Sequence, residues 1–125
     1  MLRDRDAVAN LAVKDLNVAK RFYEGTLGFE PVGREGEELV VYRSGKTTFN
    51  VYRSKEAGTN KATAVTWSVG EDLKAVVEEL KAKGVTFERY DMPGLTLDGD
   101  VYVGHGMKVG WFKDPDGNIL NIVGR

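Results

Sequence analysis

Hydrophobic and polar positions are arranged in the same pattern in the two halves of this chain. The segment AVANLAVKDL (7–16) alternates apolar and small residues, which predicts a β-strand. Asp15 is a good N-cap, so a helix should begin there, and Gly28 supplies its C-terminal stop. The apolar positions at helical spacing between them are Ala19, Phe22, Tyr23 and Leu27.

Three strand-like runs follow this helix. Turns at Glu35–Gly36 and Ser44–Gly45 separate them as hairpins. The runs are FEPVGRE (29–35), ELVVYRS (38–44) and TTFNVYRS (47–54). The first half of the chain is therefore predicted to be β-α-β-β-β.

The second half repeats the plan after a polar linker, SKEAGTNKA (54–62). We expect a strand over 62–69, a helix from near Asp72 to Gly84 and a strand over 85–89. A Gly-rich loop then delays the last hairpin, KVGWFKD (108–114) and NILNIV (118–123). The helix presents one apolar face, made of Leu73, Val76, Val77 and Leu80.

The two halves also match in detail, since LAVKDL aligns with WSVGEDL and FNVY with LNIV. The segments VKDLNVAKRFYEGTLGFEPV and WFKDPDGNILNIV resemble the two hallmarks of the vicinal oxygen chelate superfamily, which includes glyoxalase I, extradiol dioxygenases and bleomycin-resistance proteins. The resemblance implies an α+β fold in which two βαβββ modules form a cupped mixed β-sheet with helices on the outer face. It implies a single domain over 1–125, with modules over about 6–53 and 62–124, and a homodimer.

Metal-binding relatives take their ligands from four inward positions, usually His or Gln on first strands and Glu or His on last strands. The resemblance carries these positions onto Val8, Asn50, Ala64 and Asn121. Divalent cations prefer imidazole nitrogens and carboxylate oxygens. Val and Ala have no donor and Asn has only a neutral carbonyl, so we expect no metal and no other cofactor.

The alternation within strands predicts which other side chains line the inner face of the sheet. Neutral hydrogen-bonding groups on an apolar concave wall are typical of a site for an organic ligand. Trp111 is a further candidate, although the pattern leaves its face ambiguous, whereas Trp67 falls on the helix-packing face. The predicted ligand-binding residues are Asn10, Thr48, Asn50, Tyr52, Thr66, Ser68, Trp111 and Asn121.

Acid–base chemistry would have to come from the loop over 90–107, because the predicted inner face has no group that titrates near pH 7. This loop carries His105, the weak catalytic candidate, between two glycines. Long irregular loops are often lids or binding loops. A surface position on a flexible loop is the simpler interpretation of His105. The loop also carries Asp91, Asp98, Asp100 and Tyr102.

Composition narrows the function further. A net charge of −1 without a basic stripe argues against nucleic acid as a partner. The chain has no Cys and one His, which excludes thiol chemistry and metal sites that need two imidazoles from one subunit. No run approaches the roughly 20 apolar residues of a membrane span, and the N-terminus does not resemble a signal peptide. We therefore expect a cytoplasmic protein.

Three functions remain open. The leading hypothesis is a protein of the bleomycin-resistance type, which binds a small organic molecule without a metal. The alternative is a glyoxalase-like lyase or isomerase that uses a displaced metal or acid–base chemistry by His105. The third is an interaction module whose pocket is vestigial.

Overall fold

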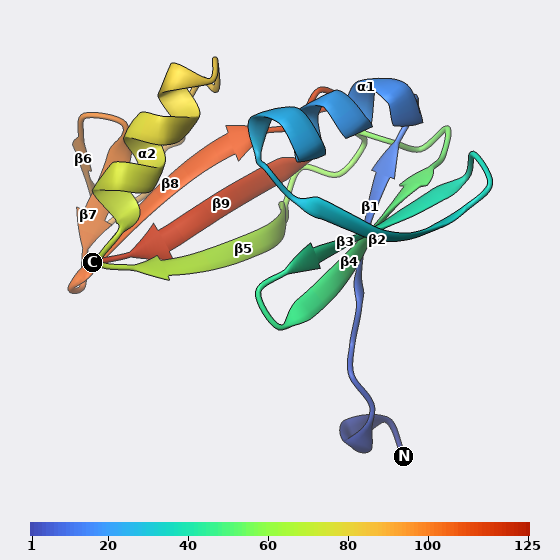
Figure 1. Cartoon of the computed structure of the whole chain (residues 1–125). Helices are drawn as coiled ribbons and strands as arrows, with labels where there is room; N and C mark the ends of the chain where they lie inside the picture. Colours follow the sequence, from blue (N-terminus) through green and yellow to red (C-terminus); the bar gives the residue numbers. More distant parts are fainter. The chain divides into compact units, whose positions relative to one another are not determined.

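The computed structural model describes all residues, 1–125, and divides them into two compact units (Figure 1). Unit 1 is Met1–Gly58 and unit 2 is Thr59–Arg125. No helix of the protein is long and apolar enough to span a membrane.

Unit 1 is a four-stranded mixed sheet with one helical segment packed against it. The strand order is β1-β4-β3-β2, with β1 parallel to β4 and the other pairs antiparallel. The elements are a 3-10 turn η1 (Leu2–Asp4), β1 (Ala9–Val13), α1 (Leu16–Lys20), the π-helical η2 (Arg21–Thr26), β2 (Glu30–Glu35), β3 (Leu39–Ser44) and β4 (Thr47–Arg53).

The helical segment of unit 1 begins where its cap predicts. The Asp15 carboxylate accepts hydrogen bonds from the backbone N–H groups of Asn17 (2.8 Å) and Val18 (3.4 Å), so two donors of the first turn are satisfied. The segment packs its apolar side chains onto one face of the sheet. The fully buried residues of this core are Leu11, Val13, Ala19, Tyr23, Val40, Tyr42 and Val51, each no more than 1% exposed.

Unit 2 is a five-stranded mixed sheet with α2 packed on one face (Figure 1). The strand order is β5-β9-β8-β7-β6, and β5 is parallel to β9. Leu73, Val77 and Leu80 of α2 are buried, as the helical spacing predicts. The elements are β5 (Thr63–Gly70), α2 (Leu73–Ala82), β6 (Thr96–Asp98), β7 (Val101–Gly104), β8 (Met107–Lys113) and β9 (Ile119–Gly124).

Both units place their first strand parallel to their last one and their helix between the first two strands of the chain order. The α+β class and the repeated two-module plan are therefore confirmed. The units differ at the sheet edge, because unit 2 has one more strand than unit 1.

Two predictions for unit 2 are wrong. Residues 85–89 form no regular strand; they add only a bridge between Phe87 and Phe112, and the Glu88 N–H donates to the Trp111 carbonyl at 2.8 Å. Residues 90–107 are not an irregular loop, since they contain β6 and β7. The two-residue turn Gly99–Asp100 joins these strands, which are too short for periodicity to reveal.

Candidate functional site

The candidate surface of unit 1 is the face of its sheet that α1 does not cover. Asn10 and Asn50 lie opposite each other on the parallel strands β1 and β4. The Asn50 Nδ2 donates to the Asn10 Oδ1 at 3.1 Å, and the Asn10 Nδ2 donates to the Val8 carbonyl at 3.4 Å. One hydrogen bond thus joins the two amides, and the Asn10 amide has a partner for both its donor and its acceptor.

Other side chains of this face follow from the same register. Thr48 and Tyr52 alternate with the buried Phe49 and Val51 along β4, and Tyr52 is 38% exposed. Sequence reasoning missed the apolar neighbours on β3, because they became visible only with the pairing. These are Leu39, opposite Tyr52, and Val41, opposite Asn50.

The candidate surface of unit 2 is a row of three side chains across three strands. Thr66 of β5 and Trp111 of β8 both lie opposite Asn121 of β9. Residues directly opposite one another share a face of the sheet, so the ambiguous face of Trp111 is settled. Asn121 is only 7% exposed, and its Oδ1 is buried without a hydrogen-bond partner.

Trp111 is fixed by aromatic and polar neighbours. The rings of Tyr90 and Tyr102 meet it edge-on, each with centroids 5.7 Å away, and its indole Nε1 donates to the Thr63 Oγ1 at 3.1 Å. An indole held by three contacts is a rigid apolar wall beside Asn121. Ser68, the remaining predicted residue of this unit, is exposed on β5.

Tyr90 and Tyr102 are functional candidates that the pattern did not place on this face. The Tyr102 hydroxyl accepts from the Tyr90 N–H at 2.6 Å and donates to the Tyr90 carbonyl at 2.7 Å, which anchors Tyr90 beside Trp111. The Tyr90 hydroxyl is itself buried without a partner. Its burial raises the pKa of Tyr90, so the phenol stays protonated at neutral pH. The alternation Val101-Tyr102-Val103 was the available signal.

Comparison with known proteins establishes the family. The profile of the Glyoxalase/Bleomycin resistance protein/Dioxygenase superfamily matches residues 6–122. The chain belongs to this superfamily. The resemblance of its two sequence hallmarks is confirmed.

Solved structures of the superfamily share the fold. The glyoxalase family protein from Enterococcus faecalis is similar with a TM-score of 0.74 at 19% identity, over 98% of this chain and 99% of that one. A bleomycin-binding protein complexed with bleomycin is similar with a TM-score of 0.71 at 20% identity, over 97% of this chain and 98% of that one. Lactoylglutathione lyase from Agrobacterium tumefaciens is similar with a TM-score of 0.68 at 17% identity, over 96% of this chain and 94% of that one. At these identities the likeness concerns the fold alone.

The residues that the sequence resemblance assigns to the superfamily's metal positions do not suit a divalent cation. Val8 and Ala64 are exposed and carry no donor atom. Asn50 already donates to Asn10, and Asn121 offers one neutral oxygen. No group of three or more His, Cys, Asp or Glu side chains gathers into a possible metal site. A cation needs several anionic or imidazole donors, so this donor set is unsuitable.

His105 is the turn residue between β7 and β8. Its side chain is exposed, and its φ of 54° lies in the left-handed region. Gly106 follows with a φ of 73°, so both residues of this two-residue turn have positive φ, as a type I′ turn requires. The geometry gives His105 a role in closing the hairpin.

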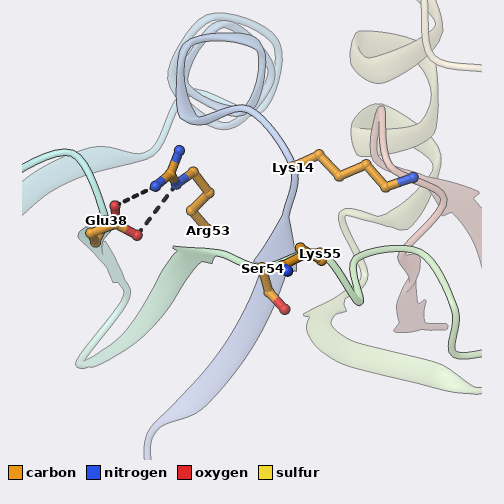
Figure 2. A pocket seen from close by; sticks show the side chains of 5 residues that line it. All are labelled: Lys14, Glu38, Arg53, Ser54 and Lys55. Carbon is orange, nitrogen blue, oxygen red and sulfur yellow. Dashed lines mark hydrogen bonds and ion pairs between the residues drawn. The ribbon is translucent and has the colours of Figure 1, made fainter.

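A cavity of about 590 Å³ in unit 1 lies away from the predicted residues. Lys14, Glu38, Arg53, Ser54 and Lys55 line it, at the carboxyl ends of β1 and β4 (Figure 2). Arg53 donates twice to Glu38, from Nη2 at 2.7 Å and from Nε at 3.3 Å, and these bonds raise the pKa of Arg53. Figure 2 shows Lys14 and Arg53 extending in different directions, so this cavity lacks convergent polar groups.

Proposed function

We propose that this protein binds a small organic molecule, without a metal ion, on the sheet face of unit 2 that carries Thr66, Trp111 and Asn121. The observation that supports this most directly is the buried Asn121 Oδ1 without a hydrogen-bond partner. The sequence resemblance assigns Asn121 to a position from which metal-binding members of the superfamily coordinate their ion.

An unpaired buried acceptor has an energetic consequence. Leaving such a group unsatisfied costs about 1–3 kcal/mol, which a ligand N–H or O–H donor could recover. The Trp111 indole beside it, fixed by two tyrosine rings, offers an apolar surface for the rest of the molecule. A fixed aromatic wall with a few neutral polar groups orients a ligand without reacting with it.

The other neutral residues predicted for the ligand are Ser68 in unit 2 and Asn10, Thr48, Asn50 and Tyr52 in unit 1. We propose these as auxiliary contacts. The hydrogen bond from Asn50 to Asn10 makes these two residues weaker candidates for a ligand contact than Asn121.

Sequestration fits this chemistry better than turnover. The structurally similar bleomycin-binding protein supports such a role by analogy. Bleomycin itself is a poor candidate here, because a large cationic drug favours a more acidic protein than one with a net charge of −1. We further propose, from the superfamily resemblance, one domain that assembles as a homodimer.

The metal question is tested first. Mass spectrometry of untagged protein, before and after soaking in nickel, zinc and manganese, should find far less than one metal ion per subunit. Close to one ion per subunit would overturn the proposal. Assays with methylglyoxal and a thiol, with and without nickel or zinc, would then examine the lyase alternative.

The ligand is sought by thermal shift with a panel of small organic molecules, read in parallel on the unmodified protein and on Asn121→Leu. The proposal expects molecules that raise the Tm of the unmodified protein and lose that effect in Asn121→Leu. Asn50→Leu is the matched control and should keep most of the response. Molecules that stabilise all three proteins equally would place binding elsewhere, and a panel without any stabiliser would favour a vestigial pocket.

A further inference from the structure

A second cavity in unit 1 lies on the helix-packed side of its sheet. Its volume is about 320 Å³. Val40 at its wall pairs with the fully buried Val51, whereas the neighbouring Val41 pairs with Asn50 on the opposite face. The cavity is therefore separate from the candidate surfaces described above. It is lined by Lys20, Glu24, Pro31, Gly33, Arg34 and Val40.

Two departures from regular structure meet at this cavity. Glu24 belongs to the π-helical segment η2, and short π-helical stretches occur frequently at functional sites. On the other wall, the register of β2 against β3 shifts between Pro31 and Gly33, as at a β-bulge. Val32 is the extra residue, so Pro31 and Arg34 lie opposite Tyr42 and Val40 and share one face although they are three residues apart in the sequence.

Glu24 is held at the wall by a buried phenol. The Tyr42 hydroxyl donates to the Glu24 Oε2 at 2.8 Å, and Tyr42 is fully buried. Burial, followed by the hydrogen bond and the charge of Glu24, raises the pKa of Tyr42, so the phenol remains a donor at neutral pH. One carboxylate oxygen is thereby occupied.

The two cations of the cavity have no carboxylate within ion-pairing distance. The ion pairs of the protein involve Arg53, Lys81, Lys83, Arg89 and Lys113, and neither Lys20 nor Arg34. The cavity thus offers two unpaired cations, one anchored carboxylate and an apolar wall of Pro31 and Val40.

We propose that this cavity binds a small zwitterion of the amino-acid type. Its carboxylate lies between Lys20 and Arg34, its ammonium group faces Glu24, and its aliphatic part contacts Pro31 and Val40. A simple anion would meet repulsion from Glu24, and a simple cation would meet it from Lys20 and Arg34. A ligand with both charges matches all three groups, and the volume is at the small end for ligand pockets.

The test is a two-dimensional amide NMR titration of the full chain with L-leucine, up to about 10 mM, which is tenfold above a millimolar Kd. Two analogues accompany it, 4-methylpentanoate without the ammonium group and 3-methylbutylamine without the carboxylate. We expect L-leucine to shift the amide signals of Glu24, Gly33 and Arg34, with a Kd about tenfold or more below that of either analogue.

Variants assign the charges. Glu24→Gln keeps an acceptor for Tyr42 but should bring the Kd of L-leucine up to that of 4-methylpentanoate. Arg34→Gln should weaken L-leucine and 4-methylpentanoate together. Arg53→Gln, which removes a cation that already has a partner, is the matched control and should change nothing.

Three outcomes would overturn the inference: no shifts at 10 mM, shifts confined to other residues, or equal affinity for L-leucine and 4-methylpentanoate. Asn121→Leu should leave this titration unchanged, so the result is independent of the function proposed for unit 2.

Discussion

Asn50 in unit 1 and Asn121 in unit 2 occupy equivalent places, each on the last strand of its unit and each opposite the first strand in parallel pairing. Their surroundings differ. Asn50 donates to Asn10 across the strand pair, whereas Asn121 faces Thr66 and leaves its Oδ1 buried without a partner beside Trp111.

This difference shows that one residue type at a repeated position can serve two purposes. In unit 1 the first strand supplies a second amide, Asn10, which accepts a hydrogen bond from Asn50. In unit 2 Thr66 stands in the place of that amide, and the neighbouring strand β8 carries the buried indole of Trp111. Unit 1 therefore has a hydrogen bond between two side chains at this position, whereas unit 2 has a buried acceptor without a donor. For this reason the ligand is proposed for unit 2.

Removing the indole of Trp111 should have the largest effect on the difference between the two units. Trp111→Ala should lower the free energy of unfolding by about 3–4 kcal/mol, because a buried aromatic side chain is replaced by a cavity. It also removes the ring contacts to Tyr90 and Tyr102 and the hydrogen bond to Thr63. Urea denaturation measures the loss. Trp67→Ala, on the opposite face and only half-buried, is the control and should cost less; an equal loss would contradict a special role for Trp111.

Replacing each of the two asparagines by leucine tests the difference between them directly. Asn121→Leu should raise the free energy of unfolding by about 1 kcal/mol, because it removes a buried acceptor that has no partner and keeps a similar shape. Asn50→Leu should lower it by about 0.5–1 kcal/mol, because a hydrogen bond is lost. Thermal and urea denaturation decide the sign. Destabilisation by both variants would mean that the Asn121 amide is already satisfied.

The hairpin of β6 and β7, at the edge where unit 2 has one more strand than unit 1, provides the next difference. Asp100, in the β6–β7 turn, accepts from Lys81 of α2 at 2.7 Å and pairs with Arg89 at 3.5 Å. The Lys81 hydrogen bond, with Arg89 adding to it, lowers the pKa of Asp100 below its usual 3.8. Asp100→Asn should cost up to about 1 kcal/mol at neutral pH.

The pH dependence of this contribution has a definite sign. A carboxyl whose pKa is lower in the folded protein stabilises it above the unfolded value and loses that effect as the pH falls through the folded value. The difference between the unmodified protein and Asp100→Asn should therefore be constant from pH 7 to 5 and shrink below about pH 4. A difference that grows on acidification would contradict the ion-pair assignment.

The repeated plan, and much of the strand alternation, could be read from the sequence. Periods of 2 and 3.6 residues persist through β4 and α2, so they identify elements and buried faces without knowledge of the pairing. The short strands β6 and β7 span three and four residues, too few for a period to emerge. The local indication of this hairpin was its turn pair, Gly99–Asp100.

The site was harder to predict, because it depends on register. Asn50 lies opposite an amide residue and Asn121 lies opposite a hydroxyl residue, and only the strand pairing reveals this. In unit 2 a register shift between Thr63 and Val65 also alters that pairing. Sequence patterns state the face of a side chain but not its partner. The left-handed conformation of His105 was equally invisible, although Gly106 indicated a turn.

The smallest predicted effect compares the hairpin turns of the two units. The β3–β4 turn of unit 1 uses Gly45 at its positive-φ position (57°), whereas the β7–β8 turn of unit 2 uses His105 at a φ of 54°. A side chain with a Cβ is disfavoured there, although His tolerates it better than most residues do. His105→Asn should stabilise the protein by a few tenths of a kcal/mol, and His105→Val should destabilise it by roughly 1 kcal/mol.

Ligand binding separates this structural role of His105 from a catalytic one. Tm values from calorimetry should rank Asn above His above Val at position 105, while the response to ligands stays the same in all three proteins. If His105→Asn instead abolished the response or a turnover, without lowering Tm, the imidazole would act in function. The hairpin tip of unit 2 would then differ from that of unit 1 in chemistry as well as in backbone conformation.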